Sequence, residues 1–593
     1  MKQSLLARLC LQGIPMALAV AAWSSSLQGQ VTTGWNQSAG GTYEYSAPAN
    51  WVGGNVNAVW DSSLSVAAGQ TITFDASLPI ASGFSFSHGG NSGITLRGTG
   101  GNRTLTLGAG IVHMAGTTAT INFGSSSANQ ELNIDLGGAV RNFTVGSGRT
   151  LGFVNVISNG GIIANGGTLN FSGANIYAGA TMVTSGTFAL NGASGSAVNS
   201  DFTVQSGGGS QSTLRFNSGT SGNTGIVRAK SVTMNGRGRS DGALLTVSGN
   251  NTENSNDSIT NALTVAEGYS VITLSGNAAR NTRLSAGSFV RNSGGTVLFR
   301  GQNLGANAIA DAVADSTNIS FTSAPTLAGT GNAGTSTVGI IKGAYGGATA
   351  SSAGSGLVTY DATRGVRLLT SSEYTTAIVN QQTQLDNVLY TRVSGGASQD
   401  IVLGAGVTTV NSLSFNVSGA GTNSGVTIGG STGATLRISS GVILANQQVT
   451  TAAVTDAIVI SAPTLDLNGQ EGVIIAFTTG LNNSNTPAPL QINSVIANDY
   501  GKGVTFGGTG QIILGGAEAN TYTGVTTLNS GFLRLNKSVA NIGLTTDLVM
   551  NGGTLLKNSN AIADTASVTI NGGTFWMDTT SSSGNNNHTE TIN

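Results

Sequence analysis

Short runs of alternating apolar and polar residues recur along this chain, and the stretch Gly508–Asn536 shows the pattern most clearly. Two runs, Gln511–Leu514 and Phe532–Leu535, flank a Tyr-Thr-Gly-Val-Thr corner at positions 522–526. Successive side chains of a strand point to opposite faces, so alternate residues of each run share one face. The residues expected to face inward are Ile512, Leu514, Leu533 and Leu535. The pattern predicts short strands separated by tight corners.

The inward positions repeat at nearly equal intervals. Ile512, Leu533, Leu555 and Phe575 follow one another with a period of about 20 residues, which is a repeat length typical of solenoids. A propeller blade takes about 40 to 50 residues, and a leucine-rich repeat needs helical segments that are missing here. The period therefore favours one turn of a parallel β-helix, in which each turn stacks on the last.

An upstream stretch, 167–191, has the same layout as 510–536. Its inward positions are Leu169, Phe171, Phe188 and Leu190, and its corner residues Tyr177, Gly179 and Thr181 correspond to Tyr522, Gly524 and Thr526. Both stretches resemble the autotransporter-associated β-strand repeat. Its pattern places Gly and Leu at every second position on both sides of an N-x-Y-x-G-x-T corner. Two further segments, 338–374 and 463–475, are similar to sequences that accompany this repeat in large secreted proteins.

This resemblance implies a β-solenoid of the pectin-lyase-like type, in a secreted or surface-displayed passenger. It brings no catalytic residues. The resemblance implies a right-handed coil, and right-handed crossovers are also the general rule for connections between parallel strands. We therefore expect an all-β, right-handed parallel β-helix that forms a single elongated body with an N-terminal cap.

Changes in composition divide the chain into six segments. Residues 30–75 hold most of the tryptophans, and 336–398 interrupt the short-strand rhythm, with Ser371–Tyr390 as a helical or extended insert and strands restarting at Asp386–Val388. A solenoid needs a cover over its first turn, so we interpret 30–75 as that cap, with a sugar-stacking platform as the alternative. The predicted segments are 1–29 (signal peptide), 30–75 (cap and first irregular strands), 76–335 (first part of the β-helix), 336–398 (insert), 399–577 (β-helix with clear repeats) and 578–593 (polar tail at a truncated end).

The first residues are typical of a secretory signal. Lys2 and Arg8 precede an apolar run, Leu9–Ala22, which is shorter than the roughly 20 residues needed to span a membrane. The alternative is a buried helix. The only cysteine, Cys10, lies in this leader, so we expect the exported chain to lack thiols, disulfides and a transmembrane span. An outer-membrane barrel pattern is absent, so the translocator is expected elsewhere: on a longer product or a separate chain.

Composition excludes several classes of protein. Charged residues are only 8% and the formal net charge is −1, so no basic field exists to recruit nucleic acid. Hydrophobic residues reach 39%, unlike the composition of disordered chains. Stacked strands account for both values, because like charges one above another repel whereas Asn, Ser and Thr form ladders.

Motifs for chemistry are weak. The run Gly429–Gly433 matches a nucleophile elbow, and Gly329, Gly331 and Gly334 match a dinucleotide fingerprint, but neither is expected to open a helix. His88, His113 and His588 are scattered. We therefore predict no cofactor and no metal site.

A polysaccharide hydrolase or lyase is the enzymatic alternative. Carboxyl groups on adjacent turns should be about one repeat period apart in sequence, and only Asp499 and Glu518 meet that spacing. The alternative interpretation is that Asp499 and Glu518 both lie in solvated loops. The basic group Arg228, Lys230, Arg237 and Arg239 has only Asp241 nearby in sequence, which favours a solvated face over an anionic-glycan site.

The function predicted from the sequence is that of a non-catalytic, exported passenger at the cell surface, outer-membrane-associated or extracellular, which presents ladders of Thr, Asn and Ser. Its expected contacts are glycans or surface and matrix components. An inert structural stalk is the second alternative.

Overall fold

The computed structural model of the 593-residue chain consists almost entirely of parallel strands, and it confirms the predicted parallel β-solenoid. It describes residues 39–50, 69–80, 83–86, 93–114, 120–207, 211–219, 225–393, 399–419, 425–449, 458–479, 490–498, 500–539, 542–557 and 561–577. The predicted signal peptide and polar tail therefore lie outside the described residues.

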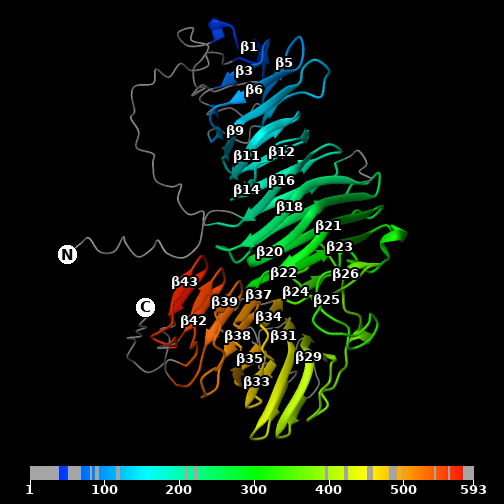
Figure 1. The fold of residues 1–593 in the computed structure, drawn as a ribbon, viewed down its shortest axis with the longest axis vertical. Coiled ribbons are helices and arrows are strands. Elements are labelled where there is room, and N and C mark those ends of the chain that lie inside the picture. The colour runs from blue at the N-terminus through cyan, green and yellow to red at the C-terminus, as the bar shows by residue number, and fades with distance from the viewer. Residues whose placement is uncertain are drawn as a thin grey trace, which may run out of the picture.

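The strands before residue 324 stack into one column, which we call the first column (Figure 1). Each strand pairs in parallel with strands one turn away, for example β10 with β12 and β12 with β15. The strands are β1 (Gly41–Glu44), β2 (Gln70–Phe74), β3 (Leu78–Ile80), β4 (Phe84–Phe86), β5 (Ile94–Gly98), β6 (Arg103–Leu107), β7 (Ile111–His113), β8 (Thr120–Phe123), β9 (Leu132–Val145), β10 (Thr150–Phe153), β11 (Ile157–Asn165), β12 (Thr168–Phe171), β13 (Ala174–Asn175), β14 (Thr181–Val183), β15 (Gly186–Asn191), β16 (Ser196–Gln205), β17 (Ser212–Asn217), β18 (Ile226–Gly236), β19 (Ala243–Ser248), β20 (Ser255–Ser275), β21 (Asn281–Arg291), β22 (Gly295–Gly301) and β23 (Ser316–Ser323).

A short antiparallel segment follows the first column. Strand β24 (Ala344–Gly347) continues the stack by pairing in parallel with β22, and β25 (Gly356–Asp361) and β26 (Gly365–Leu368) then pair antiparallel. Three short 3-10 helices, η1 (Pro48–Asn50), η3 (Ile309–Asp311) and η4 (Ser371–Glu373), are the helical elements of the described residues. The antiparallel strands lie within the segment 336–398, where the sequence predicts an interruption.

The remaining strands form the second column, with two sheets. One sheet contains β27 (Asn387–Val393), β29 (Gly406–Gly419), β31 (Ala434–Val449), β33 (Thr464–Asp466), β34 (Gly472–Thr479), β36 (Val495–Ala497), β37 (Val504–Gly508), β39 (Thr526–Leu528), β41 (Leu548–Met550) and β43 (Val568–Ile570). The other contains β28 (Gln399–Leu403), β30 (Val426–Gly430), β32 (Ile458–Ile460), β35 (Leu490–Ile492), β38 (Gln511–Leu514), β40 (Phe532–Leu535), β42 (Thr554–Lys557) and β44 (Thr574–Met577).

Each column has its own apolar core. In the first, phenylalanine rings of successive turns are in contact, with ring centroids 5.1 Å apart for the stacked pair Phe123 and Phe153, 4.9 Å for the edge-to-face pair Phe153 and Phe171, and 4.5 Å for the tilted pair Phe171 and Phe188. Parallel strands place equivalent side chains one above another, so inward positions form continuous rows. At the N-terminal end, the ring of Tyr45 stacks on Phe74 at 4.6 Å.

The length of one turn varies more than the sequence predicts. Leu151 pairs with Leu169 on the next turn, whereas Leu214 pairs with the much more distant Leu245. A constant period therefore holds only for part of the stack. Longer turns contain longer strands, such as β18 with 11 residues and β20 with 21, and register shifts interrupt the pairing of these two strands, which is why the periodicity weakens there.

The sequence predicts a single elongated body, and the structure adds that the second column folds back beside the first (Figure 1). Outward apolar side chains of β20, β22 and β24 pack against those of β31 and β34, so these strands are buried on both faces. This shared core contains Tyr269, Val271, Leu298, Ile340, Tyr345, Leu357, Val442, Leu444, Val473, Ile475 and Phe477.

Candidate functional site between the two columns

The structure places the predicted repeat-core residues in registered rows. Ile512 pairs with Leu533, Leu533 with Leu555, and Leu555 with Phe575, all facing the second core, with Phe575 only partly buried at the last strand. In the first column, Leu169 pairs with Phe188. The other residues of this set, Phe171, Leu190, Leu514 and Leu535, are also buried.

The two predicted corners adopt the same hydrogen-bonded arrangement. The buried hydroxyl of Tyr177 lies 2.9 Å from Oγ1 of Thr181, and that of Tyr522 lies 2.7 Å from Oγ1 of Thr526. Burial raises the pKa of Tyr522 to about 12 and outweighs the hydrogen bonds to threonine, which lower it. The glycine of each corner leaves room for the turn below. A Cβ at position 179 would lie 2.3 Å from the carbonyl oxygen of Gly160, and one at Gly524 would lie 2.3 Å from the nitrogen of Gly503.

The structure does not bring the candidate catalytic and metal-ligating residues together in one site. Glu518 is exposed in the loop after β38, and Asp499 lies outside the described residues, as do His88 and His588. His113 is buried in β7 with its ring edge-on to Phe86. Ser431, the centre of the elbow-like pattern, lies in a turn between strands β30 and β31, so no helix follows it.

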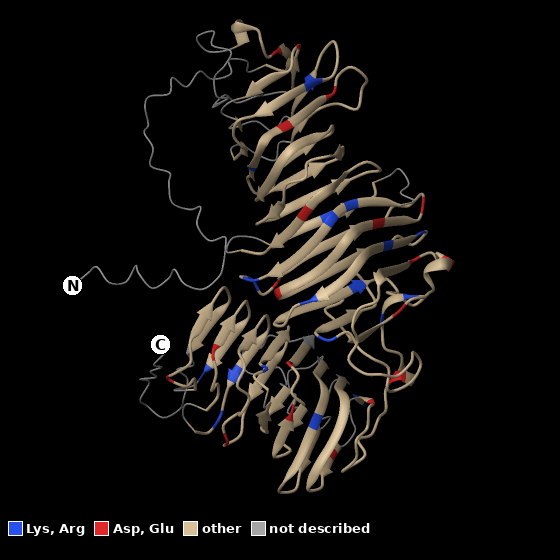
Figure 2. Ribbon diagram, viewed as in Figure 1, with Lys and Arg blue, Asp and Glu red and all other residues tan. Residues whose placement is uncertain are grey.

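Within the basic group, Arg228 differs from the solvated face that the sequence favoured, whereas the side chains of Lys230, Arg237 and Arg239 are 45%, 40% and 31% exposed. Arg228 is fully buried, and its Nε donates to Asp257 at 2.6 Å. Lys230 pairs with Asp201 at 2.8 Å, and Arg237 lies 3.3 Å from Glu267. These acids are distant in sequence but lie one turn away in space, and they add to Asp241, the acid near the group in sequence, which pairs with Arg239 at 2.7 Å. Figure 2 shows that charges are sparse on both columns.

A ladder of three asparagines joins the two columns. Arg237 donates to Oδ1 of Asn571 at 2.7 Å, Asn571 donates to Asn551 at 2.9 Å, and Asn551 donates to Asn529 at 3.0 Å. Asn529 then donates to the carbonyl oxygen of Gly294 at 2.8 Å. The ladder thus begins and ends on the first column, and every amide in it donates in the same direction, an arrangement that strengthens each bond.

Close backbone packing accompanies this ladder. The amide of Gly238 donates to the carbonyl oxygen of Asn551 at 2.7 Å. A Cβ at Gly572 would lie 2.2 Å from the carbonyl oxygen of Gly238, and one at Gly552 would lie 2.8 Å from the carbonyl carbon of Arg239. The Asn-Gly-Gly repeats therefore supply both the amide side chain and the space that docking requires.

An ion pair between Arg291 and Glu471 joins the two columns at a second place. Both terminal guanidinium nitrogens of Arg291 donate to the carboxylate of Glu471, at 2.8 and 2.9 Å, and Glu471 also accepts from the amide of Gly294 at 2.8 Å. Burial raises the pKa of Glu471, but the charge of Arg291 and the hydrogen bonds outweigh it, so the pKa lies below its usual value. Because residue 477 lies beside 345, 471 beside 291 and 571 beside 237, the columns run in opposite directions.

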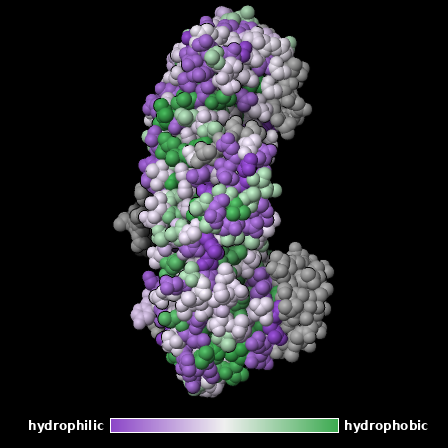
Figure 3. All heavy atoms as spheres, turned by 90° about the vertical axis from the view of Figure 1, so that its right-hand side faces the viewer, coloured by the Kyte–Doolittle hydropathy of each residue, from purple (hydrophilic) through white to green (hydrophobic). Residues whose placement is uncertain are grey.

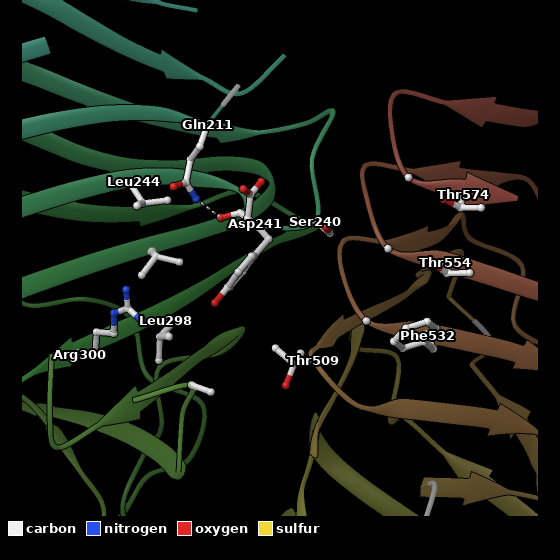
Figure 4. A pocket seen from close by; sticks show the side chains of 17 residues that line it. Gln211, Ser240, Asp241, Leu244, Leu298, Arg300, Thr509, Phe532, Thr554 and Thr574 are labelled. Atoms are coloured by element: carbon white, nitrogen blue, oxygen red, sulfur yellow. Dashed lines mark hydrogen bonds between the residues drawn. The ribbon is translucent and has the colours of Figure 1, made fainter. Parts of the chain in front are cut away.

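A cleft of about 550 Å³ remains between the columns above this contact (Figure 4). Its wall on the first column carries Asp241, Tyr269 and Arg300, and its wall on the second carries Thr554 and Phe532, among others. Other residues that line it include Gln211, Ser240, Leu244, Val271, Leu298, Thr509 and Thr574. The site is thus composed of residues far apart in sequence, which the repeat pattern could not bring together.

The charges of this cleft are already engaged. Arg239 holds Asp241 through two hydrogen bonds of 2.7 and 2.9 Å. Arg300 donates to Oγ1 of Thr273 at 2.8 Å and to the carbonyl oxygen of Ser352 at 3.2 Å. Of the described residues that the second column places in the cleft, all have uncharged side chains. Such a surface suits a polar, uncharged ligand better than an ion.

A second cleft, of about 480 Å³, lies beside the ion pair and is lined by Lys342, Arg291, Phe289 and Leu327, among others. Burial lowers the pKa of Lys342 to about 8, with Arg291 and Lys502 acting in the same direction and Glu471 opposing. No sequence pattern indicates this lysine, because the groups around it come from separate segments.

Among the described residues, no cluster of His, Cys, Asp and Glu could hold a metal ion. No helix in the same part of the chain is long and apolar enough to cross a bilayer. Compared with protein families, curated proteins and solved structures, the chain matches none.

Proposed function

We propose that this protein is an exported, non-catalytic passenger of the autotransporter-repeat type, which acts at the cell surface or outside the cell as an adhesive scaffold. The observation that supports this most is the cleft between the columns. It is lined on the second column by Thr509, Phe532, Thr554 and Thr574, with no charged side chain among the described residues of that wall. A wall of hydroxyl groups and one aromatic ring offers contacts to an extended ligand rather than an acid–base pair.

The face drawn in Figure 3 also suits adhesion by many weak contacts. On this face, polar residues and residues of intermediate hydropathy are interspersed with small apolar spots (Figure 3). The large apolar surfaces of the solenoid are already buried in the two cores and in the packing of the columns on each other. Export through a signal at residues 1–29 is part of the same proposal and is tested by finding the mature chain outside the cell.

Binding and turnover should be measured on the same protein. Arrays of glycans and immobilised matrix proteins report binding, and assays for new reducing ends or unsaturated products report hydrolysis or elimination. Binding without turnover is expected. Turnover of any bound polymer would replace this proposal with the enzymatic alternative, and the absence of any binding would leave an inert stalk.

A single introduced cysteine can test whether the cleft is the contact surface, because Cys10 is the only native cysteine and lies in the predicted leader. A Thr554→Cys variant labelled with a bulky maleimide should lose binding. The matched control is Val402→Cys on β28, where the side chain is 71% exposed and does not line the cleft. Equal loss in both labelled variants, or none in either, would place adhesion elsewhere.

A further inference from the structure

Two exposed aromatic side chains lie on one outer sheet face beside the cleft. In β40 and β44, inward positions alternate with outward ones, so Phe532 and Trp576 point away from the core row of Leu533, Leu555 and Phe575. Their exposed fractions are 43% and 55%. A single exposed apolar side chain is ordinary, but two rings together with Leu556, which pairs with Trp576, make this face a candidate contact surface.

The register between strands defines this surface, which we call the aromatic platform. Phe532 pairs with Thr554, and Thr554 pairs with Thr574, giving one outward row. Arg534, Leu556 and Trp576 form the parallel row two residues further along. The two rings are therefore two strands and two residues apart, a span of about 12 Å from standard strand geometry. The first row also lines the cleft, so the platform and the cleft are continuous.

The chemistry of the platform selects one class of partner. Of its six side chains only Arg534 is charged, so the face lacks the several cationic contacts that a nucleic acid or polyanion needs. A stable protein interface buries about 800 Å² on each side around an apolar centre, which a face of six side chains, three of them threonine or arginine, does not supply. Sugar rings present C–H faces that pack on aromatic rings, and hydroxyl edges that hydrogen-bond to threonine.

We propose that the aromatic platform binds a neutral, linear polysaccharide, with one sugar ring stacked on Phe532, another on Trp576, and the hydroxyl groups of Thr554 and Thr574 beside them. This inference rests on the proposed adhesive function and names its ligand class. The span between the rings exceeds one sugar, so the platform favours an oligosaccharide over a monosaccharide. The chain of the ligand continues from the platform into the cleft.

Binding of cellohexaose, laminarihexaose and mannohexaose to the full exported chain should be measured by calorimetry and by tryptophan fluorescence, with polygalacturonate as the anionic comparison. At least one neutral hexasaccharide is expected to bind with little dependence on salt, and to change the emission of Trp576. Phe532→Ala and Trp576→Ala should each weaken binding about tenfold. Tyr500→Ala, which removes a 76% exposed aromatic outside the cleft, is the matched control and should bind normally.

Circular dichroism of each variant separates loss of binding from loss of folding, and Phe532→Tyr should retain most of the affinity. Binding of polygalacturonate alone, or unchanged affinity in both alanine variants, overturns the inference. If the chain adheres to matrix proteins through the cleft, as judged by the labelled Thr554→Cys variant, but to no neutral glycan, the proposed function stands and the glycan inference fails. If it binds nothing, both fail.

Discussion

Asn571 donates a hydrogen bond of 2.9 Å from its Nδ2 to Oδ1 of Asn551, one turn earlier in the second column. Asn571 accepts in turn from Arg237 of the first column at 2.7 Å. A repeat that the sequence predicts as an outward polar ladder is thus part of the contact between two columns, and Asn551 is buried there. The docking of the columns, which creates the cleft, depends on this ladder and on the glycines beside it.

Replacing Gly572 by alanine should weaken the docking. The new Cβ would lie 2.2 Å from the carbonyl oxygen of Gly238, so the two backbones must separate. We expect a loss of about 1–3 kcal/mol in the free energy of unfolding, as for other overpacked sites, together with faster proteolysis around residue 238. Urea denaturation and limited proteolysis measure both. Gly207→Ala is the control, because its nearest neighbour is an oxygen at 3.8 Å; equal effects would contradict tight docking.

Replacing Glu471 by glutamine should destabilise the protein by about 3 kcal/mol at pH 7, because Arg291 is left as a buried, unpaired charge. Since the pKa of Glu471 is lowered in the folded chain, its contribution is full above the ordinary carboxyl pKa and is lost as pH falls through the folded value. The difference between wild type and variant should therefore shrink below about pH 4. Denaturation at several pH values measures this.

The matched control for that experiment is Asp466→Asn. Its ion pair with Arg437, at 2.7 Å, is much more open to solvent, with 38% of the arginine side chain exposed. Pairs of this kind contribute at most about 1 kcal/mol. A loss at Asp466 as large as that at Glu471 would show that location between the columns is not what matters.

The insert offers a second acid-sensitive contact. Glu373 accepts two hydrogen bonds of 2.7 Å from Arg367, and although burial raises its pKa, these bonds and those from the amides of Gly334 and Thr370 lower it to about 2. Its stabilising contribution is complete above the ordinary pKa and declines as pH falls toward 2. We expect Glu373→Gln to lose stability at pH 7 and to differ less from wild type at pH 2, as measured by thermal unfolding.

The two tyrosine corners should behave alike. Tyr177→Phe and Tyr522→Phe each remove a buried hydroxyl bonded to threonine, at a cost of about 1 kcal/mol. Because the pKa of Tyr522 is raised to about 12, its contribution is full below the ordinary tyrosine pKa and is lost as pH rises through 12. Ultraviolet titration of wild type and variants measures this shift. Tyr500→Phe, at an exposed site, should change neither quantity.

Lys342 should react early with amine reagents. Its pKa of about 8 leaves a substantial neutral fraction at pH 8, and it lines an open cleft. We expect dilute acetic anhydride to acetylate it faster than Lys230, which is held by Asp201 at 2.8 Å, with sites mapped by mass spectrometry. A pKa lowered by folding also means that stability rises between pH 8 and 10.5, and Lys342→Met should abolish that rise.

The strands could be predicted from the sequence because parallel stacking is local in the repeat. Ile512 and Leu533 pair directly, and their separation equals the period seen in the sequence. Where a turn is longer the signal weakens: Leu413 pairs with the more distant Ile443, and no single period covers both cases. The longer turn contains longer strands, with 14 residues in β29 and 16 in β31, and a register shift interrupts their pairing.

The cleft could not be predicted in the same way. Its walls meet because apolar residues face outward as well as inward, as in Val473 and Ile475 on either side of Ile474. A continuous apolar run of this kind signals a strand covered on both faces, but not what covers it. The pairing of Arg228 with Asp257 was missed for a related reason, because turn length had to be known first.

The folding back of the second column also orders events during synthesis. Tyr269, Val271 and Leu298 are made well before Val442 and Phe477, which cover them. The contacts that dock the columns join residues far apart in sequence: 180 residues for Arg291 and Glu471, and 334 for Arg237 and Asn571. Docking of the two columns is therefore expected to be a slow and late step of folding. A half-made chain therefore carries an uncovered apolar strip, which is an aggregation hazard that a holding chaperone would relieve before the second half arrives.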